Sequence, residues 1–232
     1  MQTFYNWVKQ RQINTYLHID DYLVNLGGNI NVKQINNQKP FRVVHIDTDK
    51  KRIDVGFKEM KESGITNFYW HRADILTKSC LENMIHQKII YVPKSVNVFS
   101  SYLSFNFDDF HLAGSGGNLN GDNILHWMST FLADDGYFIG IRSLKLAPAP
   151  TKNNSEKKKE EKEEKKDEKD DDVGWKLFVK CAEKFGLRLI STEMFEDLYK
   201  KYSDSNLSLE EMKISFSNQT FVFQKNILDE KN

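Results

Sequence analysis

The 232-residue chain contains only two cysteines, no long apolar run and no excess of charge of either sign. Cys80 and Cys181 stand far apart and are not paired with histidine, so they indicate neither a disulfide framework nor a zinc site. No apolar segment approaches the roughly 18 residues that a membrane span needs. The N-terminus also lacks the apolar core of a secretory signal. These absences predict a soluble intracellular protein, nuclear or cytoplasmic, with no membrane partner and no metal.

Charge gives no global argument for a nucleic-acid partner, because Lys plus Arg and Asp plus Glu both number 33. Any basic surface must therefore be local. The candidates lie on the two first expected helices and are Lys9, Arg11, Lys50, Lys51, Arg52, Lys58 and Lys61. Acidic residues are interleaved among them, which favours an ordinary solvated helix face over an RNA surface. If the surface does bind RNA, the affinity should fall steeply with salt.

Short apolar segments alternate with amphipathic ones along the chain. Strands are expected at 22–26, 42–46, 67–70, one of 88–92 and 96–100, 137–141, 187–190 and 220–224. Helices are expected at 1–20, 49–62, 81–86, 124–131, 175–185 and 195–202. In the helix 49–62, the pattern predicts that Ile53, Phe57 and Met60 face inward. The alternation of strand and helix predicts an α/β fold with a mostly parallel sheet and helices on both faces.

Two low-complexity segments interrupt this order. Residues 113–122 are rich in glycine but lack the G-x-x-x-x-G-K-[ST] pattern of a phosphate loop, so we expect a plain loop there. Residues 156–172 contain only Lys, Glu and Asp, which cannot bury apolar surface. We interpret 147–172 as a surface insertion, disordered or a solvated helix, within a single domain of residues 1–232.

The segment 22–47 has the outline of a nucleotide-binding unit. A short strand ends in Gly27 and Gly28, and a second strand ends in Asp47, about twenty residues beyond the turn, where such units place a ribose-binding acid. Asp74 follows the third strand, and an ionised acid there could accept a hydrogen bond from an adenine amino group. The alternative for each acid is that it caps the following helix. The glycine pattern itself is incomplete after Gly28.

Three motifs carry a resemblance to a known family. Residues 4–9, F-Y-N-W-V-K, resemble the F-N-N-W-I-K signature of eukaryotic-type mRNA cap guanine-N7 methyltransferases. Residues 135–140, D-G-Y-F-I-G, are similar to that family's P-G-G-Y-F-I-G-T stretch. Residues 181–189 and 195–199 resemble its A-x-x-Y-G-L-x-L and F-x-x-F-Y pair. Together with the strand-end acids, the resemblance covers nearly the whole chain.

The resemblance implies a single-domain, Rossmann-like class I methyltransferase with a seven-stranded sheet. Such an enzyme would transfer a methyl group from S-adenosylmethionine to N7 of the cap guanine of RNA. No catalytic side chain is implied, because N7 has a free lone pair and proximity suffices. The implied cofactor-binding residues are Lys9 at the methionine carboxylate, Gly27 and Gly28 below the cofactor, Asp47 at the ribose, Asp74 at the adenine, and Tyr102. The implied substrate-binding residues are Asn6, Leu103, Asn106 and Phe107.

The chain also departs from the family pattern. Asn25 replaces an acid, and the β-branched Ile30 and Val32 stand where the cofactor needs close backbone approach. Leu103, Asn106 and Phe107 replace the family's phenylalanine, histidine and tyrosine, and the segment with a guanine-binding glutamate has no counterpart. Three interpretations stay open. The chain is an active but divergent cap methyltransferase, a catalytically weak or inactive relative, with or without a working cofactor site, that binds RNA or stabilises a partner chain, or a methyltransferase for another RNA or protein substrate.

Overall fold

The computed structural model describes residues 2–28, 30–74, 78–102, 121–144, 174–202 and 207–226. The expected substrate residues Leu103, Asn106 and Phe107 lie outside these ranges, as do residues 113–120 of the glycine-rich run and the charged segment 147–172. None of the helices in the described ranges is long and apolar enough to cross a membrane.

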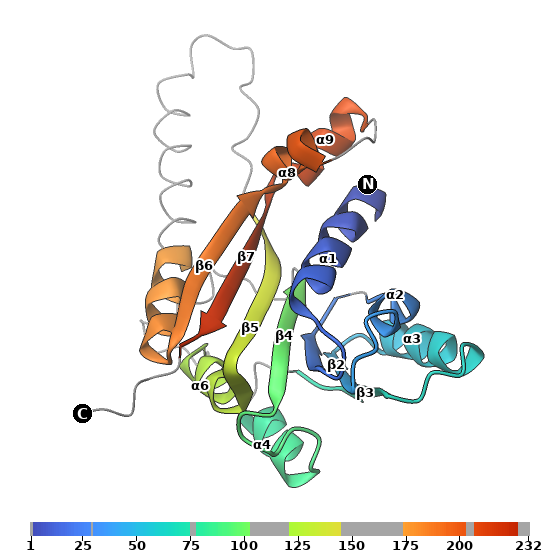
Figure 1. Ribbon diagram of the computed structural model, residues 1–232, viewed down its shortest axis with the longest axis vertical. Helices are drawn as coiled ribbons and strands as arrows, with labels where there is room; N and C mark the ends of the chain where they lie inside the picture. Colours follow the sequence, from blue (N-terminus) through green and yellow to red (C-terminus); the bar gives the residue numbers. More distant parts are fainter. Residues whose placement is uncertain are drawn as a thin grey trace, which may run out of the picture.

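One seven-stranded sheet organises the described part of the chain (Figure 1). Its strands are β1 (Tyr22–Leu26), β2 (Arg42–Asp47), β3 (Phe68–Arg72), β4 (Val96–Tyr102), β5 (Leu132–Ser143), β6 (Leu187–Met194) and β7 (Asn218–Lys225). The spatial order is β3-β2-β1-β4-β5-β7-β6. The first five strands in this order are mutually parallel, whereas β7 is antiparallel to both β5 and β6. The expected α/β fold is confirmed, and of the two candidates for the fourth strand the second is correct.

Helices cover both faces of this sheet (Figure 1). One face packs against α4 (Lys78–His86), α6 (Gly121–Phe131) and a helix over residues 174–184. The other packs against α1 (Gln2–Tyr16), α2 (Val32–Asn36), α3 (Lys50–Glu62), α8 (Phe195–Tyr202) and α9 (Leu209–Ser215). Successive residues of a strand point to opposite faces of the sheet. Val24 therefore packs on the face covered by α4 and α6, and Leu23 packs on the face covered by α1 and α2. Burial on both sides explains why the central strands are continuously apolar.

The helix α1 is fixed on the face of the sheet that also carries α2 and α3. The side-chain amide of Gln12 is buried and donates to the backbone oxygens of Gly140 on β5 and Phe221 on β7, at 3.3 and 3.4 Å. At the other end of α1, the ring of Phe4 packs edge-on against Phe195 and Tyr199 of α8. These contacts hold one side of α1 over the edge of the sheet where a ligand binds in open α/β folds.

Two short helices and one side chain differ from the sequence-based expectation. The helix α2 is only five residues long and is capped by Asn31, whose side chain accepts from the Gln34 amide, so it gives no readable period. The helix α9 begins with a capping box of Ser208 and Glu211. The expected inward position of Phe57 is wrong. Its side chain is 43% exposed and lies under the Lys61 ammonium.

Candidate cofactor site at the carboxyl ends of the central strands

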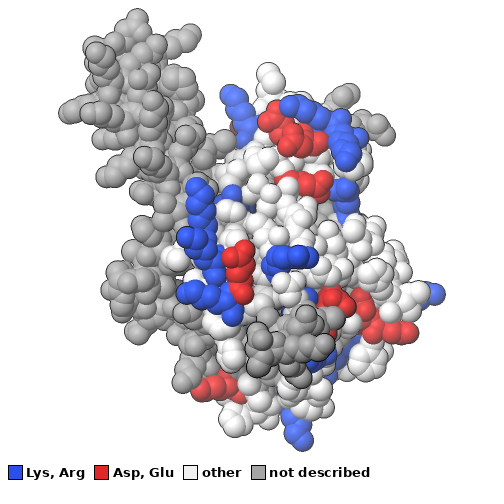
Figure 2. Space-filling model, turned by 60° about the vertical axis from the view of Figure 1, so that its left-hand side comes forward, with Lys and Arg blue, Asp and Glu red and all other residues white. Residues whose placement is uncertain are grey.

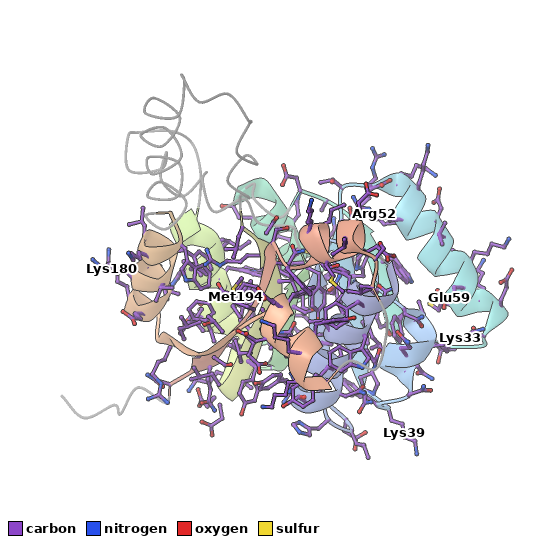
Figure 3. All side chains as sticks on the ribbon, turned by 90° about the horizontal axis from the view of Figure 1, so that it is seen from above. Lys33, Lys39, Arg52, Glu59, Lys180 and Met194 are labelled. Atoms are coloured by element: carbon purple, nitrogen blue, oxygen red, sulfur yellow. The ribbon has the colours of Figure 1, made fainter. Side chains whose placement is uncertain are left out.

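A cavity of about 1150 Å³ lies where β1 and β2 end, between α1 and α3. Figure 3 looks down on this side of the molecule, with Arg52 near the start of α3 and Glu59 farther along the same helix, beside Lys33 of α2. The cavity is lined by every expected site residue within the described ranges, namely Asn6, Lys9, Gly27, Gly28, Asp47, Asp74 and Tyr102. Residues from α1, the β1 turn, β2, the end of β3 and β4 thus meet in one place.

The turn after β1 depends on glycine. Gly27 and Gly28 have φ angles of 72° and 76°, in the region that side chains other than glycine's disfavour. A Cβ on Gly28 would also lie 2.8 Å from the backbone oxygen of Tyr102. Of the two β-branched residues expected to crowd the turn, Val32 is fully buried in the core, and Ile30 lines the cavity. Of these two residues, therefore, only Ile30 borders the cavity.

A row of buried polar side chains crosses three strands just below this turn. Ser100, Asn25 and His45 are partners in register on β4, β1 and β2. The Ser100 hydroxyl donates to Asn25 Oδ1 at 2.7 Å, and Asn25 Nδ2 lies 2.8 Å from His45 Nδ1. Asn25 Nδ2 also donates to the Gly27 backbone oxygen at 2.8 Å. This role of His45 was not predicted from the sequence. The available signal was a polar residue inside each apolar strand, two positions before Gly27 and two before Asp47.

The carboxylate of Asp47 is buried, with 4% of the residue exposed. Its Oδ1 accepts from the Asp49 amide at 2.7 Å. Its Oδ2 accepts no hydrogen bond from the described residues, and lies 3.5 Å from Arg52 Nε and 3.7 Å from His45 Nε2. Burial alone raises the pKa of Asp47, but the nearby His45 ring, the hydrogen bond from the Asp49 amide and the Arg52 charge bring it below its ordinary value. A buried, ionised oxygen at the end of β2 can accept from a ribose hydroxyl.

The helix-cap alternative is resolved for Asp47. Asp49 is the N-cap of α3, because its side chain accepts from the Lys51 amide at 2.8 Å. Asp47 therefore does not cap that helix. Asp74 is exposed and lies on the lining of the cavity just beyond β3. The next described helix, α4, begins at Lys78, so the capping alternative for Asp74 falls outside the described residues.

Lys9 extends from α1 into the cavity between two tyrosine rings. Its ammonium lies 4.7 Å from the ring centre of Tyr102 and 5.6 Å from that of Tyr5, and only 9% of the residue is exposed. Burial lowers the pKa of Lys9 to about 8, so the side chain is still largely protonated at neutral pH. Burial also raises the pKa of Tyr102, with a further contribution from Tyr5, and keeps the phenol neutral. A cation held between aromatic faces is suited to an anionic group of a ligand.

The candidate RNA residues on α1 and α3 are mostly engaged within the protein. Lys50 pairs with Asp54 at 2.5 Å, Lys58 with Glu62 at 3.8 Å, Arg52 with Asp49 at 3.1 Å and Arg11 with Glu193 at 3.2 Å. On the β6 side, Figure 2 shows Lys and Arg next to Asp and Glu, without one broad basic field among the residues coloured there. These contacts agree with the solvated, internally paired helix face that interleaved charges favour.

Several solved methyltransferases of low sequence identity have a similar fold. Geranyl diphosphate C-methyltransferase from Streptomyces coelicolor A3(2), solved with Mg²⁺, geranyl diphosphate and S-adenosyl-L-homocysteine, superimposes with a TM-score of 0.57 at 11% identity, over 95% of this chain and 79% of that one. An S-adenosylmethionine-dependent methyltransferase from Mesorhizobium loti also gives 0.57 at 11% identity, over 95% and 97%. The fold is that of class I S-adenosylmethionine-dependent methyltransferases.

This fold alone does not specify the reaction. The [4+2]-cyclase SpnF also superimposes, with a TM-score of 0.54 at 7% identity over 94% of this chain and 80% of that one. The sequence matches no protein-family model and no curated protein. The resemblance to cap methyltransferases therefore rests on the motifs alone, and the activity has to be argued from the site.

Proposed function

We propose that the chain binds S-adenosylmethionine in the cavity at the ends of β1 and β2 and transfers its methyl group. The observation that carries this proposal is the meeting of three unlike groups in one cavity. These are the glycine turn at Gly27, the buried carboxylate of Asp47 and the ammonium of Lys9. Each suits a different part of the cofactor, and no two of them are close in sequence.

Each residue would act by binding and orientation. The turn at Gly27 and Gly28 has no side chain and so admits the cofactor close to the backbone. Asp47 Oδ2 would accept from a ribose hydroxyl, and Asp74 from the adenine amino group. The Lys9 ammonium would bind the methionine carboxylate. When bound, S-adenosylmethionine supplies an activated methyl group, and alignment with an acceptor lone pair provides the rate enhancement.

For the acceptor we propose N7 of an RNA cap guanine, on the strength of the sequence likeness. The support from the site is that Asn6 and Lys9, both from the N-terminal motif, line the cavity. Other parts of the likeness serve the fold. Phe4 and Phe195, from two of the motifs, pack on each other, and a Cβ on Gly140 would lie 2.2 Å from the Ser101 oxygen. Those residues support the architecture and give no preference for an acceptor.

A second candidate is a methyltransferase-like subunit without activity that binds RNA or stabilises a partner chain. It is favoured by Asn25, which stands where the family has an acid, and by Arg52, whose guanidinium lies 3.5 Å from Asp47 Oδ2, the oxygen that the ribose would use. A methyltransferase with another RNA, a protein or a small molecule as acceptor is a third candidate. The similar solved structures include an enzyme crystallised with geranyl diphosphate.

A transfer assay separates these candidates. Purified chain is incubated with methyl-labelled S-adenosylmethionine and RNA carrying an unmethylated guanine cap, and the same RNA with a 5′-triphosphate and no cap is the control. Label on the capped RNA alone supports the cap proposal. Label on both RNAs indicates another RNA acceptor. Cofactor binding without transfer to either supports the inactive subunit or a different acceptor, and a cap analogue that does not compete with RNA overturns cap recognition.

A further inference from the structure

The hydrogen bonds of the Asn25 side chain determine which ring nitrogen of His45 carries the proton. The Gly27 backbone oxygen can only accept, so the Asn25 atom 2.8 Å from it is the amide nitrogen. The Ser100 hydroxyl donates to the other end of the amide, at Oδ1. The second hydrogen of Asn25 Nδ2 then points to His45 Nδ1, which lies 2.8 Å away and has to accept. The neutral imidazole therefore carries its hydrogen on Nε2.

His45 Nε2 faces Asp47 Oδ2 at 3.7 Å, and both side chains are almost completely buried. The imidazole is held from its other side by Trp70, whose ring lies 4.9 Å from it in an edge-on arrangement. Trp70 is in turn placed against Gly56 of α3, where a Cβ would lie 2.0 Å from the Trp70 ring. The orientation of the Nε2–H group is thus fixed by contacts from β1, β3 and α3.

We infer that His45 is a positioning residue for the ribose-binding carboxylate of Asp47, an inference that rests on the proposed cofactor site. The Nε2–H group orients Oδ2 toward the cavity, and Asn25 keeps the imidazole in the tautomer that can do so. In the structure the two atoms are 3.7 Å apart and make no hydrogen bond, so the bond that we propose forms when the ribose binds. An amide at position 25, where the family has an acid, therefore suits a neutral His45 ring. An acid at that position would attract a proton to Nδ1 and charge the ring in a buried site.

The burial of the pair supports this assignment. Desolvation lowers the pKa of His45, against the nearby carboxylate of Asp47, which raises it, so the ring is neutral at neutral pH. A neutral ring with Nδ1 already accepting has one proton to offer, and Oδ2 is the acceptor that it faces.

The test compares two substitutions, each of which keeps a polar group near one of the two ring nitrogens of His45. His45→Gln retains a donor near the position of Nε2, whereas His45→Asn retains a polar group near Nδ1 and loses the donor. Calorimetry measures the binding of S-adenosylhomocysteine and of its analogue without the 2′- and 3′-hydroxyls. We expect His45→Asn to weaken S-adenosylhomocysteine about tenfold, the size of one charge-assisted hydrogen bond. Binding of the dideoxy analogue should change by less than about twofold, since that analogue lacks the groups that Asp47 would hold.

The His45→Gln variant provides the control, and two outcomes would contradict the proposals. His45→Gln should bind S-adenosylhomocysteine within about threefold of the unaltered chain, because it restores the donor. If both ligands weaken equally in His45→Asn, or neither weakens, His45 does not act through the ribose acid. Should the unaltered chain bind neither ligand, the proposed function itself fails.

A second measurement detects the His45 tautomer directly and does not require any variant to bind a ligand. In ¹⁵N-labelled chain, the imidazole nitrogen shifts distinguish the two neutral tautomers, and the His45 signals are identified by their loss in His45→Gln. The Nε2–H tautomer at neutral pH is expected. The Nδ1–H tautomer, or an imidazolium at that pH, contradicts the inference even if the His45→Asn variant fails to fold.

Discussion

The backbone of Gly28 lies against the backbone of Tyr102, so closely that a Cβ on Gly28 would stand 2.8 Å from the Tyr102 carbonyl oxygen. This approach joins the turn after β1 to the end of β4 and fixes the floor of the cavity. Both partners are main-chain atoms, which cannot move aside as a flexible side chain can. A side chain at position 28 must displace the turn, the end of β4 or both.

Gly28→Ala should therefore destabilise the fold and the ligand site together. The matched control is Gly64→Ala, because Gly64 has a similar φ of 67° but nothing within 4 Å of its Cβ position. Both substitutions place Ala in the left-handed region, at about 1 kcal/mol. Gly28→Ala should cost at least about 1 kcal/mol more, from the added steric conflict. Urea unfolding of the two variants measures the difference, and equal losses would contradict the close contact.

Gly56→Ala should be destabilising although it lies in a helix. In an exposed helix position this change would stabilise by about 1 kcal/mol. Here the new Cβ would lie 2.0 Å from the Trp70 ring, and overpacking of this kind costs about 1–3 kcal/mol. The control is the same substitution in a Trp70→Leu background, where the smaller side chain removes the conflict. Thermal unfolding of the four chains gives the coupling, and a coupling near zero would show that Trp70 does not pack on Gly56.

Lys9 should make the stability of the fold depend on pH in the alkaline range. Burial lowers the pKa of Lys9 from 10.5 to about 8, so between these values the unfolded chain binds more protons than the folded one. The free energy of unfolding contributed by this group therefore rises with pH across that window. Lys9→Met removes the titrating group, and its stability should rise less, or fall more, than that of the unaltered chain. Parallel curves from pH 8 to 10 would contradict the lowered pKa.

Ligand binding should draw a proton onto Lys9. A carboxylate beside the ammonium raises its pKa, so at about pH 8.5 S-adenosylhomocysteine should bind with proton uptake. Calorimetry in buffers of different ionisation enthalpy measures that uptake. Lys9→Met corrects for the titration of the ligand's own amine and should reduce the uptake. Identical uptake by the two chains would remove Lys9 from the carboxylate site.

The sequence could predict the parts of this molecule that depend on local pattern. The apolar strands, the glycine turn at Gly27 and the acid at Asp47 each stand out from their neighbours, and the structure brings both residues to one cavity. The paired role of Asn25 and His45 could not be read in this way, because it depends on the register of β1 against β2. The helix α2 was not predicted, because five residues are too few to show a helical period.

The family resemblance predicted the fold better than the acceptor, for a physical reason. Phe4, Phe195 and Tyr199 pack together where α1 meets α8, and Gly140 allows β5 to approach its neighbours. Motifs built from such residues serve the packing of the fold, whatever the chain binds. Asn6 and Lys9 belong to the same N-terminal motif but line the cavity, so they are the part of that motif placed to contact a ligand there.

The most direct test of the cofactor site is calorimetric titration of the unaltered chain, Asp47→Asn and Asp54→Asn with S-adenosylhomocysteine. Asp54 is the matched control, since it is an exposed acid of α3 paired with Lys50 and does not line the cavity. We predict submillimolar binding to the unaltered chain and to Asp54→Asn. Binding to Asp47→Asn should be weaker by about tenfold or more, as expected for loss of a charge-assisted hydrogen bond. No binding to the unaltered chain at high ligand concentration, or equal binding to all three, would contradict the account.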